Sequence, residues 1–479
     1  MTKSKKILLA IIATILLSVG IFYYGGHFNC VEIRVLAFND FHGAIEEIEG
    51  IGASKFVNEI KKETTETTLV ISAGDNYNGQ AISNLLYGKP VSEIFKEINV
   101  VASAIGNHEF DWGTDKISVW EEDMNAPFVS ANIVKNGDYI VKPYIIKEVK
   151  GIKVAFIGLT TLEASYKSNR NFIKYFEFLD PVETAKKMVK EVKSKGADIV
   201  ILLTHIGTFT DKDTGVIKFE NKKLEELTRI DGVNAIITAH YHKEVSGFIN
   251  DVPVVQSLPK GQSFSIIEFD INKKSKKIYF TEIFTENLVE KKDELEDDQK
   301  TLEIIEKYNN QLSGILEENI GMVKEKISYD KYKKSPLGDL ITSILKDSVN
   351  ADISMLNGGS ITGEILPGVL KIKDVYSILP FDNLFVVANI QGKDIKTIMD
   401  HGMSGAEIGR IQYSGIKKIN DTYILDNGEP LEDEKYYKVA TNDFMTSGGD
   451  LYNFDNAKDI EEIGYIRNAV IEGLRKKYN

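Results

Sequence analysis

Six short apolar runs constrain the fold of this chain more than any other feature, because a polar cluster follows each of them. The runs are IRVLAF (33–38), TLVIS (68–72), VVASAI (100–105), KVAFIGL (153–159), DIVILLT (198–204) and NAIITA (234–239). Helix-like segments such as PVETAKKMVKEVKSKGA lie between several of them. Alternating strands and helices predict an α/β fold, and near-continuous apolar strands predict sheets that are covered on both faces.

The length of the chain, 479 residues, exceeds what one hydrophobic core normally supports, so we expect two domains. The first domain is placed at 31–285 and the second at 319–479, where glycine-rich turns (NGGS, SGGD) separate shorter elements. Between them, residues 286–318 are rich in charge and contain no proline, which predicts a linker helix with a solvated face. Its apolar positions fall on one helical stripe: Leu302, Ile305, Tyr308 and Leu312.

Residues 1–30 differ from the rest of the chain. Lys3, Lys5 and Lys6 precede an uncharged run of 18 residues from Ile7 to Tyr24. This run is at the lower edge of what spans a membrane and is longer than most signal-peptide cores. Because no clear small-residue cleavage site follows, we favour an uncleaved membrane anchor over a cleaved signal, with the remainder of the chain exported.

The cysteine count and the net charge narrow the class of protein further. Cys30 is the only cysteine, so the exported chain would contain no internal disulfide, and an idle thiol is at least as good an interpretation as lipidation. The formal net charge of −13 argues against general nucleic-acid binding through a basic surface. A local site for a small anion remains compatible with this charge.

Five of the seven histidines follow predicted strands directly, each inside a polar cluster. They are His42 in NDFHG, His108 in GNHEFD, His205 in THIG, and His240 and His242 in AHYHK. The same strand ends carry four further polar residues: Asp40, Asp75, Asn107 and Asp111. Because the carboxyl ends of strands in an open α/β sheet converge on one crevice, we expect these side chains to meet there.

The residue types in this crevice predict a metal centre. Imidazole and carboxylate ligands suit Zn²⁺, Mn²⁺ and similar divalent ions. The cluster holds more ligands than one tetrahedral ion uses, so two ions about 3.5–4 Å apart that share a carboxylate are expected. The spacing of Asp40 and His42 places both on one face of an extended strand, where they can bind the same ion. His240 and His242 have the same spacing but would more easily serve two neighbouring ions.

In this order, the blocks NDFHG, GDN, GNHEFD, THIG and AHYHK resemble the five signature segments of the calcineurin-like metallophosphoesterases. GNHEFD together with NGGSI and NDFMTSGGD resembles the 5′-nucleotidase branch, which includes UDP-sugar hydrolases and 2′,3′-cyclic nucleotide phosphodiesterases. The resemblance covers nearly the whole chain from residue 31 onward. It implies an N-terminal four-layer α-β-β-α metallophosphoesterase domain, joined by a helix to a C-terminal α/β nucleotidase domain.

The resemblance also implies the metal ligands. The first ion would be bound by Asp40, His42 and His242, and Asp75 would bridge to the second ion. The second ion would be completed by Asn107, His205 and His240. The ions would neutralise phosphate oxygens and lower the pKa of a bound water, which would attack phosphorus in line without a covalent enzyme intermediate.

By the same resemblance, His108 is not a ligand but faces the substrate and stabilises the phosphoryl group or the leaving oxygen. Asp111 would orient and polarise His108 through a hydrogen bond. We assign no chemical role to Glu109 and expect it to contribute to packing or to lie at the surface.

In the second domain, three residues match positions that contact the nucleoside in the family. Phe444 would stack on the base, Asp450 would accept hydrogen bonds from ribose hydroxyls, and Asn357 would line the same pocket.

Three other positions depart from the family pattern. Thr362 stands where an arginine usually ends NGGxxR, and Arg410 stands where a second stacking phenylalanine is common. Lys333 lies near the place of another arginine, and it could neutralise phosphate without the planar two-point contact of arginine. These departures leave the preferred substrate open.

We therefore expect an exported, membrane-anchored hydrolase of 5′-nucleotidase type that acts in nucleotide catabolism and uses two divalent ions such as zinc or manganese. A 2′,3′-cyclic nucleotide phosphodiesterase or a UDP-sugar hydrolase on the same centre is the alternative. A non-catalytic binding protein with a degenerate fold should have lost metal ligands, and a metal-storage protein would not explain His108 and Asp111. The expected partners are a nucleotide-derived substrate and the membrane, not nucleic acid, and closure of the two domains on substrate is expected to need a hinge.

Overall fold

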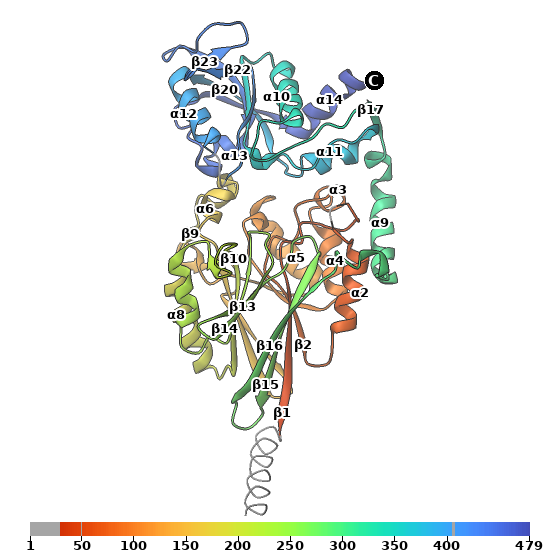
Figure 1. Ribbon diagram of the computed structural model, residues 1–479, viewed down its shortest axis with the longest axis vertical. Helices are drawn as coiled ribbons and strands as arrows, with labels where there is room; N and C mark the ends of the chain where they lie inside the picture. The colour runs from red at the N-terminus through yellow and green to blue at the C-terminus, as the bar shows by residue number, and fades with distance from the viewer. Residues whose placement is uncertain (1–28, 49, 405–407) are drawn as a thin grey trace, which may run out of the picture.

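The computed structural model describes residues 29–48, 50–404 and 408–479. These residues form two lobes stacked along the long axis of the molecule, the first lobe below the second in Figure 1. The expected N-terminal anchor, with its lysines and its apolar run, lies outside the described residues. Within the described ranges, no helix combines the length and the apolar character that crossing a membrane requires.

The first lobe contains two large sheets packed face to face. One consists of β16 (Ile278–Asn287), β15 (Ser263–Asn272), β1 (Cys30–Phe38), β2 (Thr68–Ser72), β3 (Val100–Ala104) and β4 (Phe128–Val129), in this order. The other consists of β13 (Val245–Ile249), β14 (Val252–Gln256), β12 (Ala235–Ala239), β10 (Ile199–Thr210), β8 (Ile152–Thr160) and β7 (Tyr144–Val149), with β11 (Ile217–Phe219) beside β10. Alternate residues of both sheets, such as Val35, Ile71, Phe156 and Ile201, form the buried layer between them.

Helices cover the outer faces of both sheets. The first sheet is covered by α2 (Ala53–Glu63), α4 (Lys89–Glu97) and α5 (Asp115–Met124), and the second by α8 (Pro181–Ser194) and the 3-10 helix η2 (Lys222–Arg229). Phe38 of β1 packs edge-on against Phe56 and Phe95 of the covering helices. The two-domain α/β architecture with a four-layer first domain is therefore confirmed, and it buries both faces of the apolar strands as the sequence predicts.

Short elements connect these layers and surround the strand ends. They are α3 (Ala81–Asn84), η1 (His108–Phe110), α6 (Ala164–Lys167), α7 (Arg170–Ile173) and a small sheet of β5 (Ile133–Lys135), β6 (Asp138–Tyr139) and β9 (Glu177–Phe178). In Figure 1, α6 and α3 stand at the top of the first lobe, directly below the second. They are therefore placed to contact both domains.

The linker helix α9 (Gln299–Leu316) is shorter than the expected 286–318. The residues before it complete β16 and form the 3-10 turn η3 (Lys292–Glu294), and the Asp298 carboxylate begins the helix by accepting a hydrogen bond from Thr301 N. The helix runs along one side of the molecule between the lobes (Figure 1). Its apolar face is buried against the helical layer of the first lobe through Ile304, Tyr308, Leu312 and Leu316.

The second lobe is built on a five-stranded sheet. Its strands, in order, are β21 (Gln412–Ser414), β18 (Ile353–Leu356), β24 (Tyr436–Asn442), β20 (Leu384–Gln391) and β25 (Lys458–Tyr465). Two hydrophobic cores flank it, one with α10 (Pro336–Ser348), α11 (Ile372–Ile378) and α14 (Ile466–Tyr478), the other with α12 (Gly392–Met403). Smaller elements complete the lobe: β17 (Asn319–Val323), β19 (Gly368–Lys371), β22 (Ile416–Ile419), β23 (Thr422–Leu425), α13 (Asp443–Thr446), η4 (Gly358–Ser360) and η5 (Gly449–Leu451).

Candidate metal centre and active site

The polar clusters after the strands meet at the edge of the first lobe that faces the second lobe. Five residues of these turns adopt a left-handed backbone although none is glycine: Asp40, His42, Asp75, His240 and His242, with φ between 48° and 76°. Each such conformation costs of order 1–3 kcal/mol and is typical of functional sites. The turns therefore adopt an unfavourable backbone conformation that directs their side chains toward one point.

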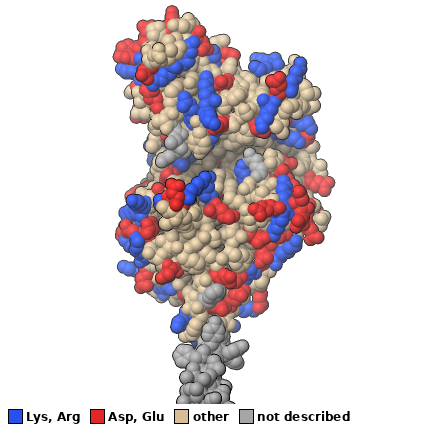
Figure 2. Space-filling view, viewed as in Figure 1, with Lys and Arg blue, Asp and Glu red and all other residues tan. Residues whose placement is uncertain are grey.

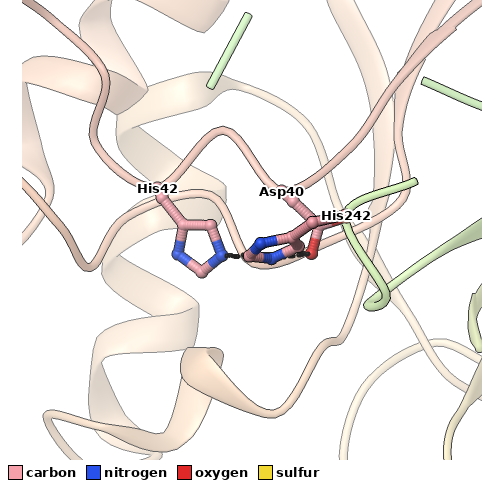
Figure 3. A group of neighbouring side chains, drawn as sticks. All are labelled: Asp40, His42 and His242. Carbon is pink, nitrogen blue, oxygen red and sulfur yellow. Dashed lines mark hydrogen bonds and ion pairs between the residues drawn. The ribbon is translucent and has the colours of Figure 1, made fainter. Parts of the chain in front are cut away.

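Asp40, His42 and His242 form the first group of candidate ligands, and their ligand atoms all lie within 4.8 Å of one another. His242 Nε2 is 3.3 Å from Asp40 Oδ1 and 3.1 Å from His42 Nε2, so the three side chains point toward one another (Figure 3). Burial, together with the neighbouring His242, lowers the pKa of His42 to about 3. His42 is therefore neutral and offers a lone pair.

Asp75, His205 and His240 form a second group with the same spread of ligand atoms. His205 Nε2 lies 3.1 Å from Asp75 Oδ2, while His205 Nδ1 lies 2.8 Å from Ala73 O. Burial opposes a charge on His205, but the Asp75 carboxylate outweighs it and raises the pKa of His205 to about 10. Burial lowers the pKa of His240 to about 4.

Asn107, the remaining predicted ligand, adds an observation that points to a cation. Its Oδ1 is buried and has no hydrogen-bond partner among the described residues. The site also buries two carboxylates, Asp40 at 0% and Asp75 at 1% exposure. Burying acceptors and charges in this way is costly unless cations compensate them. The donor set, of carboxylates, imidazoles and one amide oxygen, therefore fits two divalent ions.

His108 and Asp111 lie next to these groups and are joined by a hydrogen bond. His108 Nδ1 is 2.8 Å from Asp111 Oδ2, and the same oxygen accepts from Asn78 Nδ2 at 2.7 Å. Burial opposes the imidazolium, but Asp111 and Asp75 raise the pKa of His108 to about 9. A cationic imidazole held by a carboxylate can stabilise a phosphoryl oxygen or protonate a leaving group.

Glu109, which the sequence left without a role, is fully buried and supports the whole turn. Its carboxylate accepts backbone hydrogen bonds from Gly106 at 2.7 Å and from Asp75 and Asn76 at 2.9 Å each. It therefore ties the turn after β2 to the turn after β3. The one feature of the sequence that pointed to this role is the position of Glu109 beside Asn107 and His108 in GNHEFD.

The second lobe presents Asn357, Phe444 and Asp450 together. Asn357 Nδ2 donates to Asp450 Oδ2 at 3.1 Å, and Asn442 Nδ2 donates to Asn357 Oδ1 at 3.0 Å. The Phe444 ring lies over Gly449, where a Cβ would come within 2.6 Å of it. Glycine at 449 therefore makes room for this aromatic side chain.

The three positions that depart from the family pattern lie in different surroundings. Lys333 is at the surface, 78% exposed, and pairs with Asp330 at 2.9 Å. Thr362 Oγ1 donates to Ser377 O at 2.7 Å, within its own lobe. Arg410 N donates to Lys331 O at 2.8 Å. Lys331, which sequence reasoning did not single out, lies with its side chain against Gly409 and within electrostatic reach of Asp450.

The two lobes meet directly at the site. Asn169 Nδ2 of the first lobe donates to Asp443 Oδ2 of the second at 2.8 Å, and Trp112 Nε1 donates to Asp382 Oδ2 at 2.8 Å. Figure 2 shows a hollow at this junction, with both basic and acidic side chains on its rim. A molecule bound in the hollow would touch residues of both lobes.

Residues 33–244 match the family model of the calcineurin-like phosphoesterases, and residues 319–457 match that of the 5′-nucleotidase C-terminal domain. The first lobe therefore carries a calcineurin-like phosphoesterase domain, and the second carries a 5′-nucleotidase C-terminal domain.

The chain is similar to curated relatives and to solved structures over most of its length. It is 27% identical to endonuclease YhcR of Bacillus subtilis over 87% of its own length but only 37% of the relative's length. It is 26% identical to protein UshA of Escherichia coli, covering 93% of this chain and 91% of UshA. A crystal structure titled as a 5′-nucleotidase precursor from Thermus thermophilus shares the fold, with a TM-score of 0.78, 22% identity and coverage of 94% and 97%.

Proposed function

We propose that this protein is a two-metal phosphohydrolase that releases phosphate from nucleotides. The observation that carries the proposal is the pair of ligand groups, Asp40–His42–His242 and Asp75–His205–His240, with the His108–Asp111 pair beside them. Nothing in a binding protein would require a carboxylate-held imidazole next to complete ligand groups.

Each part of the site has a distinct task in this proposal. Two divalent ions, zinc or manganese, would neutralise phosphate oxygens and lower the pKa of a bound water. His108 would donate to the phosphoryl group or leaving oxygen, with Asp111 holding its orientation. Phe444 would stack on a base. Asp450 would accept hydrogen bonds from ribose hydroxyls, and Asn357 would donate hydrogen bonds to them.

Hydrolysis of 2′,3′-cyclic nucleotides or UDP-sugars on the same centre is the second candidate. It is favoured by Thr362, whose hydroxyl is engaged with Ser377, and by Lys333, which is paired at the surface. An arginine clamp on a terminal phosphate would therefore be missing from these two positions. Lys167 and Lys331 would instead supply positive charge near Asp450.

We also propose that the enzyme works outside the cytoplasm, held at the membrane by residues 1–30. The basic residues before the apolar run in the sequence support this. Cell fractionation with protease protection of the full chain would test it.

The catalytic proposal is tested by product formation from AMP, 2′,3′-cyclic AMP and UDP-glucose, with Mn²⁺ or Zn²⁺ added to the full chain. We expect metal-dependent hydrolysis that falls by roughly 10²–10⁴-fold in His108→Ala, as for loss of a general acid. Glu191→Ala, on the remote helix α8, is the matched control. A folded, metal-loaded chain that hydrolyses none of the three substrates would contradict the proposal.

A further inference from the structure

The segment 161–170, which follows β8, contacts every residue assigned to the second ion alone. Thr161 N donates to His205 O at 2.8 Å, and Ser168 Oγ donates to Asn107 O at 2.8 Å. Glu163, between them, lies 2.9 Å from His240 Nε2 through its Oε2 atom. Asn169, which follows Ser168, donates a hydrogen bond to Asp443 of the second lobe. One segment thus supports half of the metal centre and touches the other domain.

Glu163 makes its contact with His240 in a protected setting. The His240 side chain is 5% exposed and that of Glu163 is 19% exposed. Lys167, one helical turn further along α6, pairs with the same Glu163 oxygen at 2.7 Å. The Glu163 backbone N donates to Thr161 Oγ1 at 3.1 Å, so both ends of this residue are held.

The chemistry of a metal-binding histidine gives this contact a consequence. Such a histidine is neutral and carries a single ring N–H, and the other nitrogen supplies the lone pair. A carboxylate only accepts hydrogen bonds. An N–H shared with Glu163 must therefore be on Nε2, which leaves the lone pair of Nδ1 for an ion held with Asp75 and His205.

We propose that Glu163 is a positioning residue that holds His240 in its Nε2–H form and so tightens binding of the second ion, with Lys167 keeping the carboxylate in place. This inference rests on the proposed two-metal function. Partners of this kind typically change metal affinity or activity by 10–100-fold when they are removed.

Glu163 and Glu220 could themselves be taken for ligands, because their ligand atoms and one of His240 lie within 4.8 Å of one another. Their contacts argue against this. Lys167 already neutralises Glu163. Glu220 accepts from Thr161 Oγ1 at 2.7 Å and from Gly207 N at 3.0 Å. A separate ion at this point would displace a cation and two hydrogen bonds.

The test is a calorimetric titration of the metal-free full chain with Mn²⁺, for wild type, Glu163→Ala and Glu163→Gln. We expect two ions in the wild type and a 10–100-fold weaker second ion in Glu163→Ala, with the first ion unchanged. Glu163→Gln should lose less, because its amide oxygen still accepts from Nε2–H. Glu191→Ala, which removes a similar four-residue-spaced pair with Lys195 (3.0 Å) at the C-terminal end of α8, should bind as the wild type does.

A second measurement reads the histidine directly. In ¹⁵N-histidine spectra of the metal-free chain, the Nε2–H form of His240 should be present in wild type and lost or mixed in Glu163→Ala. Should that variant fail to fold, Glu163→Asp shortens the carboxylate and is expected to weaken the second ion as well.

Three results would overturn the inference. They are an unchanged second-ion affinity in Glu163→Ala or Glu163→Asp, an Nδ1–H form of His240 in the wild type, and a third ion that Glu163→Ala removes. A wild type that binds two ions but hydrolyses nothing would instead contradict the proposed function and leave the Glu163 result standing. A wild type that binds fewer than two ions would overturn both.

Discussion

The ring of Phe381 in the second lobe stacks on the imidazole of His108 in the first, with centroids 5.3 Å apart and planes at 16°. The residues on either side of Phe381 are also anchored to the first lobe. Pro380 O accepts a hydrogen bond from Asn84 Nδ2, and Asp382 accepts from Trp112 Nε1 at 2.8 Å while it pairs with Arg467. The position of His108 therefore depends on contacts from both domains.

Replacing Phe381 by alanine should lower turnover without loss of metal. A stacked aromatic pair contributes about 0.5–1.5 kcal/mol beyond its buried area, so a fall in kcat of roughly 2- to 10-fold is expected. Steady-state kinetics and metal analysis would check this. Phe248→Ala, an exposed aromatic of β13 (52%), is the control and should behave as the wild type. Equal kcat values for Phe381→Ala and wild type would show that the stacking does not orient His108.

Removal of metal should destabilise the first lobe. Asp40 and Asp75 are buried carboxylates that cations would compensate. Binding of an ion at 100 times its Kd stabilises the folded state by about 2.7 kcal/mol. We expect the Tm of the first lobe to fall on addition of a chelator and to recover with excess Mn²⁺, as measured by differential scanning calorimetry. A Tm independent of chelator would contradict the metal assignment.

Glu109→Ala should destabilise the protein more than a typical surface change. The substitution leaves three buried backbone N–H groups, of Gly106, Asp75 and Asn76, without their acceptor. Each unsatisfied group costs about 1–3 kcal/mol, so a loss of roughly 3 kcal/mol or more is expected in urea unfolding. Glu109→Gln keeps one acceptor oxygen and should lose less. A ΔΔG below about 1 kcal/mol for Glu109→Ala would refute this account.

Turnover should depend on relative movement of the lobes. Asn169→Cys with Asp443→Cys, in a Cys30→Ser background, places two thiols where a hydrogen bond of 2.8 Å now joins the lobes. If catalysis includes opening and closing, the oxidised pair should turn over several-fold more slowly than the reduced pair, with the same metal content. Loss of free thiols would confirm bond formation. Identical rates in both redox states would argue that no hinge motion takes part.

The amino-acid sequence by itself determined the layers of the first lobe and the gathering of its metal-type ligands. Strand-length apolar runs bury both faces, and the carboxyl ends of parallel strands point to one edge, so the positions of Asp40 and Asp75 follow from local patterns. His205, expected just after its strand, lies inside β10, which continues to Thr210. The linker helix was also predicted, although its start at Gln299 depends on the cap at Asp298, within a charged segment that has no sharp boundary.

Tertiary structure alone decided how these ligands are supported and what faces them. Glu163 meets His240 although 77 residues separate them, and Phe381 meets His108 across the domain boundary. Lys333 points to solvent while the neighbouring Lys331 approaches Asp450. These outcomes depend on how loops and lobes pack against one another. The spacing of apolar residues and the residue types indicate only which face of its own helix or strand a side chain occupies. They therefore cannot predict contacts between distant segments.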